Sequence, residues 1–411
     1  MRILLLGLNY APEEIGIGLY SGDMARALAA SGKQVRAIVA KPYYPAWKVF
    51  DGYSGKRWER EVDEGVDVTR CPLYVPAKPT GLRRILHLIS FAAAAFVPTV
   101  KAGYKIRPHV VFTTAPSLIA APIAWLVGWL TRAKTWLHIQ DFEIEAAFAT
   151  GLIDPDTLPA RIAAKVENWI LQRFDVVSSI SPQMCAALVR KGVDPTRIYE
   201  FRNWADVDAV RPLGGESLYR TEWGITTPYV ALYAGNIANK QGIEIVLEAA
   251  AALRDRTDLT FVICGEGQNR ARLERAAAQL GNVQIHDLQP RERLGELLGL
   301  ATVHLLPQLA DAADLVLPSK LTNMLASGRP VVATADVDTG LAAEVAGCGI
   351  TTPPGNAQLF ATAITDLLDA AKRRTLLGQT ARLRAEERWS KTAILDRFTE
   401  KLARIVDNAD P

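Results

Sequence analysis

The sequence has few cysteines, and none of them is arranged for a metal site. Its four cysteines are spread over 411 residues without a C-x-x-C pair, which is typical of buried, reduced thiols in a reducing compartment. The first ten residues hold one Arg and only a short apolar run, so we expect no secretory signal peptide. The Asp-Val-Asp triplet at 206–208 lies in the expected linker, and the one at 336–338 follows an expected strand, where a structural turn is an equally good explanation. We therefore expect no metal ion and no other cofactor.

Acidic residues are missing from a long stretch of the first half. Between Cys71 and Gln140 there is no Asp or Glu, while eight Lys and Arg occur there. Residues 1–205 carry 25 − 18 = +7 charges, and residues 206–411 carry 22 − 26 = −4. A basic surface favours an anionic partner. Since no nucleic-acid-binding motif accompanies it, we expect no nucleic-acid partner.

Two apolar runs, 85–100 and 115–130, lie within this acid-free stretch. Each has 16 residues, whereas a membrane-spanning helix needs about 20. The second run suits a buried core helix. The segment Leu82–Val100 has basic residues on both sides, so a core helix and an interfacial helix on an anionic membrane both remain open.

Apolar strand-like runs alternate with helical patterns along the chain, and the alternation restarts near Pro228. Such a pattern predicts an α/β fold with two doubly wound, Rossmann-like domains. We expect an N-terminal domain at 1–205, a second domain at 206–390, and a helix at 391–411 that packs back on the first. The expected strands are 3–8, 34–40, 110–114, 135–139 and 176–180, then 229–233, 260–264, 283–286, 303–306, 331–333 and 349–351.

Ligands of such sheets bind at the carboxyl ends of the strands, and two facing domains create a cleft there. A Gly-rich turn, GLNYAPEEIGIG, follows the first strand and precedes a helix that we expect at 21–31, with Ser21 as its cap. Gly16 and Gly18 permit close approach of the backbone to an anion at the helix N-terminus. A Gly-rich turn alone is as often structural.

Two segments of the second half have polar residues where a strand meets a helix. In YAGNIANKQG these are Asn236, Lys240 and Gln241, and a Lys at a helix N-terminus binds a diphosphate as a point charge. In LPSKLTNMLASG, Ser319 is a plausible helix cap, and Lys320 and Asn323 share one face. These residue types suit phosphate and sugar hydroxyls, although ordinary capping also explains them.

A fourth group of polar residues follows the strand at 135–139, in the sequence WLHIQDFEIE. Asp141 is the first acid after the acid-free stretch, and loops at this end of a strand carry function. We therefore interpret Asp141 as a candidate catalytic residue, with His138 and Glu145 in supporting roles.

Together these motifs resemble the retaining GT-B glycosyltransferases of family four, and most narrowly the fucosyltransferases of colanic-acid and related exopolysaccharide clusters. The resemblance covers nearly the whole chain, and GNIANKQG and LPSKLTNMLASG are its most specific parts. It implies transfer of a sugar from a nucleoside diphosphate donor, GDP-fucose or similar, to a lipid-linked polysaccharide precursor. It also implies that the protein is peripheral on the cytoplasmic face of the membrane. The segment that would contact the anionic membrane surface is Leu82–Val100.

The chain departs from the wider family at several positions. Asn236 and Gln241 stand where an Arg and a Lys are usual, which leaves Lys240 and Lys320 to supply charge. Leu315 and Asn323 replace a pair of Glu, and Gln140 replaces a His, which moves the catalytic role to Asp141. Three alternatives stay open: a UDP-hexose or UDP-N-acetylhexosamine donor, a GT-B epimerase or hydrolase, and an inactive nucleotide-binding protein.

Overall fold

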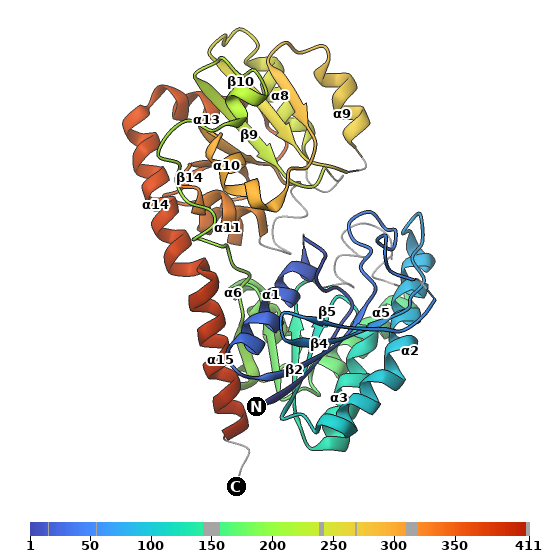
Figure 1. Cartoon of the computed structure of the whole chain (residues 1–411). Helices are drawn as coiled ribbons and strands as arrows, with labels where there is room; N and C mark the ends of the chain where they lie inside the picture. Colours follow the sequence, from blue (N-terminus) through green and yellow to red (C-terminus); the bar gives the residue numbers. More distant parts are fainter. Residues whose placement is uncertain are drawn as a thin grey trace. The chain divides into compact units, whose positions relative to one another are not determined.

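The computed structural model describes residues 1–14, 16–54, 56–142, 157–237, 242–267, 269–309 and 319–407. The chain divides into two compact units (Figure 1). Unit 1 contains Met1–Arg202 and Ile394–Pro411, and unit 2 contains Asn203–Ala393. These boundaries lie close to the expected ones, and the C-terminal helix belongs to unit 1 for most of its length.

Unit 1 is built on an eight-stranded sheet in the order β3-β4-β2-β1-β5-β6-β7-β8. All neighbouring strands are parallel except β3 and β4. The central strands are buried along most of their length, which is why they are continuous apolar runs in the sequence. The strands are β1 (Arg2–Gly7), β2 (Gln34–Ala40), β3 (Glu59–Asp63), β4 (Val66–Cys71), β5 (Val110–Ala115), β6 (Lys134–Ile139), β7 (Val176–Ser179) and β8 (Ile198–Glu200).

Helices cover both faces of this sheet. From β5 onward each strand is added on the same side, so right-handed crossovers put the connecting helices on one face, whereas the crossover from β1 to β2 runs the other way. Figure 1 accordingly shows α2 and α3 on one side of the sheet, with α1 and α15 on the other. The helices are α1 (Ile17–Ala30), α2 (Gly81–Ile106), η1 (Leu118–Ala120), α3 (Ala121–Thr131), α5 (Leu158–Leu171), α6 (Pro182–Arg190) and α15 (Lys391–Asp407).

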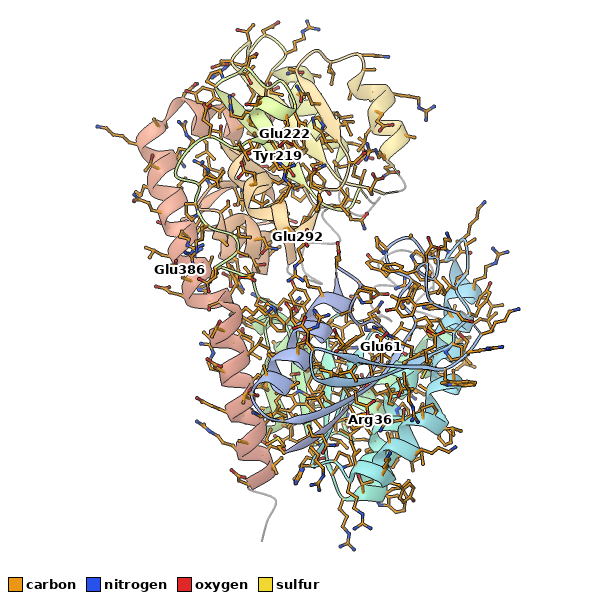
Figure 2. The ribbon with its side chains drawn as sticks, in the orientation of Figure 1. Arg36, Glu61, Tyr219, Glu222, Glu292 and Glu386 are labelled. Carbon is orange, nitrogen blue, oxygen red and sulfur yellow. The ribbon has the colours of Figure 1, made fainter. Side chains whose placement is uncertain are left out.

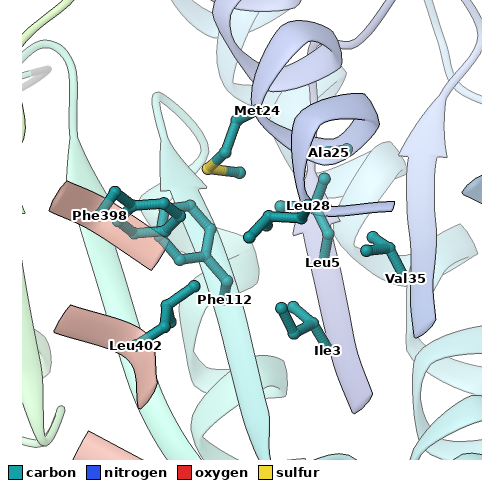
Figure 3. A pocket seen from close by; sticks show the side chains of 9 residues that line it. All are labelled: Ile3, Leu5, Met24, Ala25, Leu28, Val35, Phe112, Phe398 and Leu402. Carbon is teal, nitrogen blue, oxygen red and sulfur yellow. The ribbon is translucent and has the colours of Figure 1, made fainter. Parts of the chain in front are cut away.

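The C-terminal helix α15 is held on unit 1 by aromatic packing. The ring of Phe398 stacks on Phe201 with centroids 4.2 Å apart, and it meets Trp136 at 5.1 Å. Figure 3 shows a small apolar cavity where α15 faces α1 and the sheet, and its lining includes Met24, Phe398 and Leu402. This packing closes the core over the α1 face of the sheet.

Unit 2 has a six-stranded parallel sheet in the order β11-β10-β9-β12-β13-β14. Its strands are β9 (Tyr229–Ala234), β10 (Leu259–Cys264), β11 (Val283–His286), β12 (Val303–Leu306), β13 (Val331–Thr334) and β14 (Gly349–Thr352). Its described helices include α7 (Tyr219–Glu222), α8 (Glu244–Ala252), α9 (Arg270–Ala277), α10 (Leu294–Gly299), α11 (Ser319–Ala326), α12 (Gly340–Val345), α13 (Ala357–Asp369) and α14 (Ala371–Trp389).

Three features differ from the expectations. The first helix begins at Ile17, so the prediction of Ser21 as its cap is wrong: Ser21 is buried inside the helix. Glu59–Asp63 and Val66–Cys71 form an unpredicted antiparallel hairpin. Ser319 is the first residue of α11, so it is not the cap residue that precedes the helix, as was expected.

The apolar run at 85–100 lies within α2, and the structure extends it to a 26-residue helix. By length and composition alone this helix is long and apolar enough to cross a membrane, but one face of it packs on the sheet and on α3. The run at 115–130 forms the end of β5, η1 and most of α3, whose inner side is buried.

Candidate functional site

In unit 2, the loop after β9 meets the first turn of α11. The ammonium of Lys320 donates a hydrogen bond of 2.7 Å to the Tyr233 hydroxyl and lies 4.2 Å from the centre of that ring. The hydroxyl in turn donates to the carbonyl oxygen of Asn236 at 2.6 Å. Burial raises the pKa of Tyr233, so the hydroxyl stays protonated and makes both contacts. Two of the sequence motifs therefore meet at one point.

The loops after β9 and β10 approach each other so closely that only glycine fits. A Cβ on Gly265 would overlap the carbonyl oxygen of Gly235, and a Cβ on Gly267 would overlap the backbone of Ile237. The backbone N–H of Ile237 donates to the carbonyl oxygen of Glu266 at 2.8 Å. These contacts fix the turn that carries Asn236 beside Lys320. Gly265, Gly267 and Tyr233 were not among the predicted site residues, because the close approach of the two loops depends on strand register.

Of the remaining residues predicted to bind the donor, the structure describes only some. Asn323 lies one turn after Lys320 on α11 and is partly buried, as is Asn236. Lys240 and Gln241 lie outside the described residues, as does Leu315. Nothing is described of the side chain of Ser319. The structure thus brings together Asn236, Lys320 and the Tyr233 hydroxyl.

In unit 1, the Gly-rich turn after β1 is organised around the buried carboxylate of Glu13. One oxygen of Glu13 accepts hydrogen bonds from the backbone N–H groups of Tyr43 and Tyr44, both at 3.0 Å, and the other accepts from the Asn9 amide at 2.8 Å. Burial raises the pKa of Glu13 above its ordinary value. The carboxylate therefore ties the turn after β1 to the loop after β2.

Gly16 and Gly18 serve this turn in different ways. Gly16 has φ 67°, a left-handed conformation that favours glycine. A Cβ on Gly18 would lie 2.6 Å from the Cβ of Glu13, so close packing inside the protein already requires glycine at this position. The turn is thus accounted for by its own packing, and donor binding by either glycine stays a prediction.

Buried ion pairs support the same edge of the sheet from the β3–β4 hairpin. The Arg70 guanidinium is 1% exposed and lies 2.6 Å from Glu61, which Figure 2 labels on this hairpin. Lys41, which follows β2, is fully buried and pairs with Glu59. The unpredicted hairpin therefore provides the acids that neutralise two buried cations beneath the Gly-rich turn.

The residues at the end of β6 separate into core and surface. His138 is buried, its Nδ1 lies 2.9 Å from the Ser178 hydroxyl, and its ring lies 5.0 Å from that of Phe201. Burial lowers its pKa to about 3, so the ring is neutral. These are the surroundings of a structural histidine, and we give His138 no role in transfer. Asp141 is partly buried after the end of the strand, and Glu145 lies outside the described residues.

Comparison with known proteins shows the family of the chain. Residues 16–204 match the glycosyl transferase 4-like domain model, and residues 228–370 match the model of glycosyl transferases group 1. The chain is 39% identical, over 97% of its length and 98% of the relative's, to the putative colanic acid biosynthesis glycosyl transferase WcaI of Escherichia coli (strain K12). The chain belongs to this glycosyltransferase family.

The solved structures that resemble this glycosyltransferase share its fold. Sucrose-phosphate synthase from Thermosynechococcus elongatus has a TM-score of 0.74 at 19% identity, covering 99% of this chain and 100% of that one. Anabaena HepE, solved in complex with UDP, has a TM-score of 0.71 at 16% identity, covering 98% of this chain and 100% of that one. The expected α/β fold of GT-B type, with two Rossmann-like domains, is confirmed.

Proposed function

We propose that the chain transfers a sugar from a nucleoside diphosphate donor, with retained anomeric configuration, to a lipid-linked precursor of an exopolysaccharide. The observation that carries the proposal is the meeting of Lys320 with the Gly235–Asn236 turn at the carboxyl edge of the second sheet. A fixed ammonium at the start of a helix stabilises the charge that develops on a departing diphosphate. The identity with the colanic acid relative over nearly the whole chain supports the exopolysaccharide assignment.

The proposed donor is GDP-fucose or a similar nucleotide sugar. A thermal-shift screen of GDP, UDP, CDP and their common sugars tests this, because a ligand that binds only the folded state raises its apparent stability. We expect GDP to raise the Tm of the wild type and not that of Lys320→Met. Stabilisation by UDP alone would indicate that the donor is a UDP-sugar. A screen in which no diphosphate raises the Tm would contradict the proposal.

On the acceptor side we propose that Asp141 is the catalytic carboxylate. Its position after the end of β6 is where parallel sheets present functional groups. A carboxylate there stabilises an oxocarbenium-like centre or orients the acceptor hydroxyl. The chemistry requires no metal ion or other cofactor, because an ammonium and a helix N-terminus supply the positive charge that the diphosphate needs.

We further propose that α2 brings unit 1 to the cytoplasmic face of an anionic membrane, where a lipid-linked acceptor resides. Arg83 and Arg84 are exposed at one end of its outer face and Lys101 and Lys105 near the other, and α2 contains no acid. Apolar and basic residues on one helix face suit the headgroup boundary. This outer face, the α2 surface, comprises Leu82, Ile85, Leu86, Ile89, Phe96 and Val97, which are 43–71% exposed.

Sedimentation with anionic vesicles tests the membrane part separately from the chemistry. Wild type should sediment at low salt and less at high salt, because each base contributes about 1 kcal/mol that salt screens. Arg83→Glu with Arg84→Glu should stay in the supernatant while its affinity for the diphosphate is unchanged. If wild type does not sediment at low salt, α2 is not a membrane contact, and an epimerase or hydrolase with soluble substrates gains support.

A further inference from the structure

A second apolar face is exposed on unit 1, on helix α5. Four exposed apolar side chains of α5 recur at intervals of four, four and three residues and therefore point to one side of the helix. Their exposed fractions are 70%, 53%, 50% and 47%, far above those of core residues. This face, the α5 surface, comprises Leu158, Ile162, Val166 and Trp169.

The charges on this side of α5 are of one sign. Arg161, Lys165 and Arg173 are exposed beside the apolar side chains, and the Arg173 guanidinium lies 4.8 Å from the centre of the Trp169 ring. The one acid of α5, Glu167, points the other way: it is 3% exposed and forms an ion pair with Lys191 at 2.5 Å. This buried pair fixes the rotation of α5, so the basic and apolar face stays outward.

The α5 surface lies on the same face of the sheet as the α2 surface. The crossovers from β4 to β5 and from β6 to β7 run in the same direction along the sheet, so both helices cover one face. Helix α3 lies between them. A Cβ on Gly103 of α2 would overlap Val127 of α3, and on the other side the rings of Trp125 and Trp169 are 6.2 Å apart. Trp129 of α3 is 70% exposed.

We propose that the α5 surface, with Trp129, is a second contact of unit 1 with an anionic lipid bilayer, so that α2 and α5 together lay one face of the sheet on the membrane. This inference rests on the membrane part of the proposed function. Lys and Arg among apolar side chains reach headgroups while their stems stay in the acyl boundary, and Trp is enriched at that depth. A symmetric dimer through this face would instead place three cations of one copy against the same three of the other.

A fluorescent label on α5 tests the contact directly. Ile162→Cys, labelled with an environment-sensitive dye, should gain intensity and shift to shorter wavelength on vesicles of phosphatidylcholine with phosphatidylglycerol, and not on phosphatidylcholine alone. The control is the same dye on Lys372→Cys, an exposed position of α14 in unit 2, which should not respond. If the dye on Ile162→Cys does not respond while the protein sediments with the same vesicles, the α5 contact is overturned and the α2 contact stands.

Charge reversal distinguishes this proposal from the α2 proposal and from self-association. Arg161→Glu with Lys165→Glu should weaken vesicle affinity at least about tenfold, whereas the matched control Lys372→Glu with Arg373→Glu should leave it unchanged. An unchanged affinity of the α5 variant would overturn the inference. Absence of wild-type binding would overturn both proposals. A dimer in analytical ultracentrifugation that the α5 variant dissociates, without any vesicle response, would assign the face to a second copy instead.

Discussion

Lys320 of α11 and Tyr233 of β9 hold each other at the carboxyl edge of the second sheet, with 2.7 Å between ammonium and hydroxyl. The two residues are 87 positions apart in the chain, and each belongs to a different motif. The same hydroxyl reaches the Asn236 carbonyl, so one tyrosine orients both the cation and the turn. This contact brings two separate sequence motifs together at one point of the fold.

Substitution of these two residues should affect donor binding unequally. Lys320→Met keeps the stem but removes the charge, and a hydrogen bond to a charged group contributes roughly 1.5–3 kcal/mol, so the Kd for the diphosphate should rise at least about tenfold. Tyr233→Phe removes only the anchoring hydroxyl and should raise the Kd about threefold to tenfold. Isothermal titration measures both, with Lys372→Met as the control. Wild-type affinity in Lys320→Met would contradict the donor assignment.

The strands of both sheets were largely predictable because parallel strands buried on both faces are continuous apolar runs. The hairpin of β3 and β4 was not, since Glu59–Asp63 has charged side chains at most positions and pairs only at the sheet edge. Helix α14 was missed because few of its residues are buried and it has no clear apolar face. Local patterns report burial, and β3 and α14 have little of it, whereas the buried strand β4 carries the polar residues Asp67, Thr69 and Arg70 among its apolar ones.

The site was predictable only where a residue carries its own chemistry. Lys320 is such a residue. Gly265 is not, since its need for glycine comes from the pairing of β9 with β10, which sets it against the Gly235 carbonyl. The sequence did contain a signal that His138 is buried, because His138 lies on the same strand face as Trp136. In the structure that face packs under Phe398 of α15. Its place in a continuous apolar strand, buried on both faces, therefore indicated a core position.

The catalytic role of Asp141 makes a sharp kinetic prediction. Asp141→Asn keeps the shape of the side chain and removes its charge, so folding and diphosphate affinity should stay close to wild type. The transfer rate should fall at least about a hundredfold, the scale of a positioned general acid or base. A transfer assay beside calorimetry of the diphosphate checks this. Activity within a few fold of wild type would place the catalytic group elsewhere, with Glu145 as the next candidate.

His138 should affect stability and not catalysis. Its pKa is lowered from 6.5 to about 3 in the folded state, so the neutral ring contributes stability above pH 6.5 that is progressively lost as the pH falls toward 3. His138→Gln should lower the free energy of unfolding at pH 7.5 by about 1–3 kcal/mol. Because glutamine does not titrate, the deficit should narrow at pH 5, as urea titrations at both pH values would show. A hundredfold lower kcat in a fully folded His138→Gln variant would instead show that His138 is catalytic.

Glu13 should give the opposite dependence on pH. Burial raises its pKa above 4.5, so between pH 4.5 and the raised value the unfolded chain has lost a proton that the folded protein keeps. Wild type therefore loses stability over this interval as the pH rises. In Glu13→Gln the amide oxygen still accepts from the backbone N–H groups of Tyr43 and Tyr44, whereas the amide nitrogen cannot accept from the Asn9 amide, a loss that does not depend on pH. Because glutamine does not titrate, the stability of this variant relative to wild type should increase from pH 4.5 to pH 7.5 in urea titrations.

The matched control for Glu13 is Glu59, whose hydrogen bond from Lys41 lowers the pKa of its carboxyl. A lowered pKa contributes stability above pH 4.5 that is lost as the pH falls. Glu59→Gln should therefore lose stability relative to wild type as the pH rises, the reverse of Glu13→Gln. Comparing each variant with wild type at the same pH cancels the contributions of the buried histidines. If the two variants change in the same direction, the carboxyl of Glu13 is ionised in the folded protein, and its three hydrogen bonds outweigh its burial.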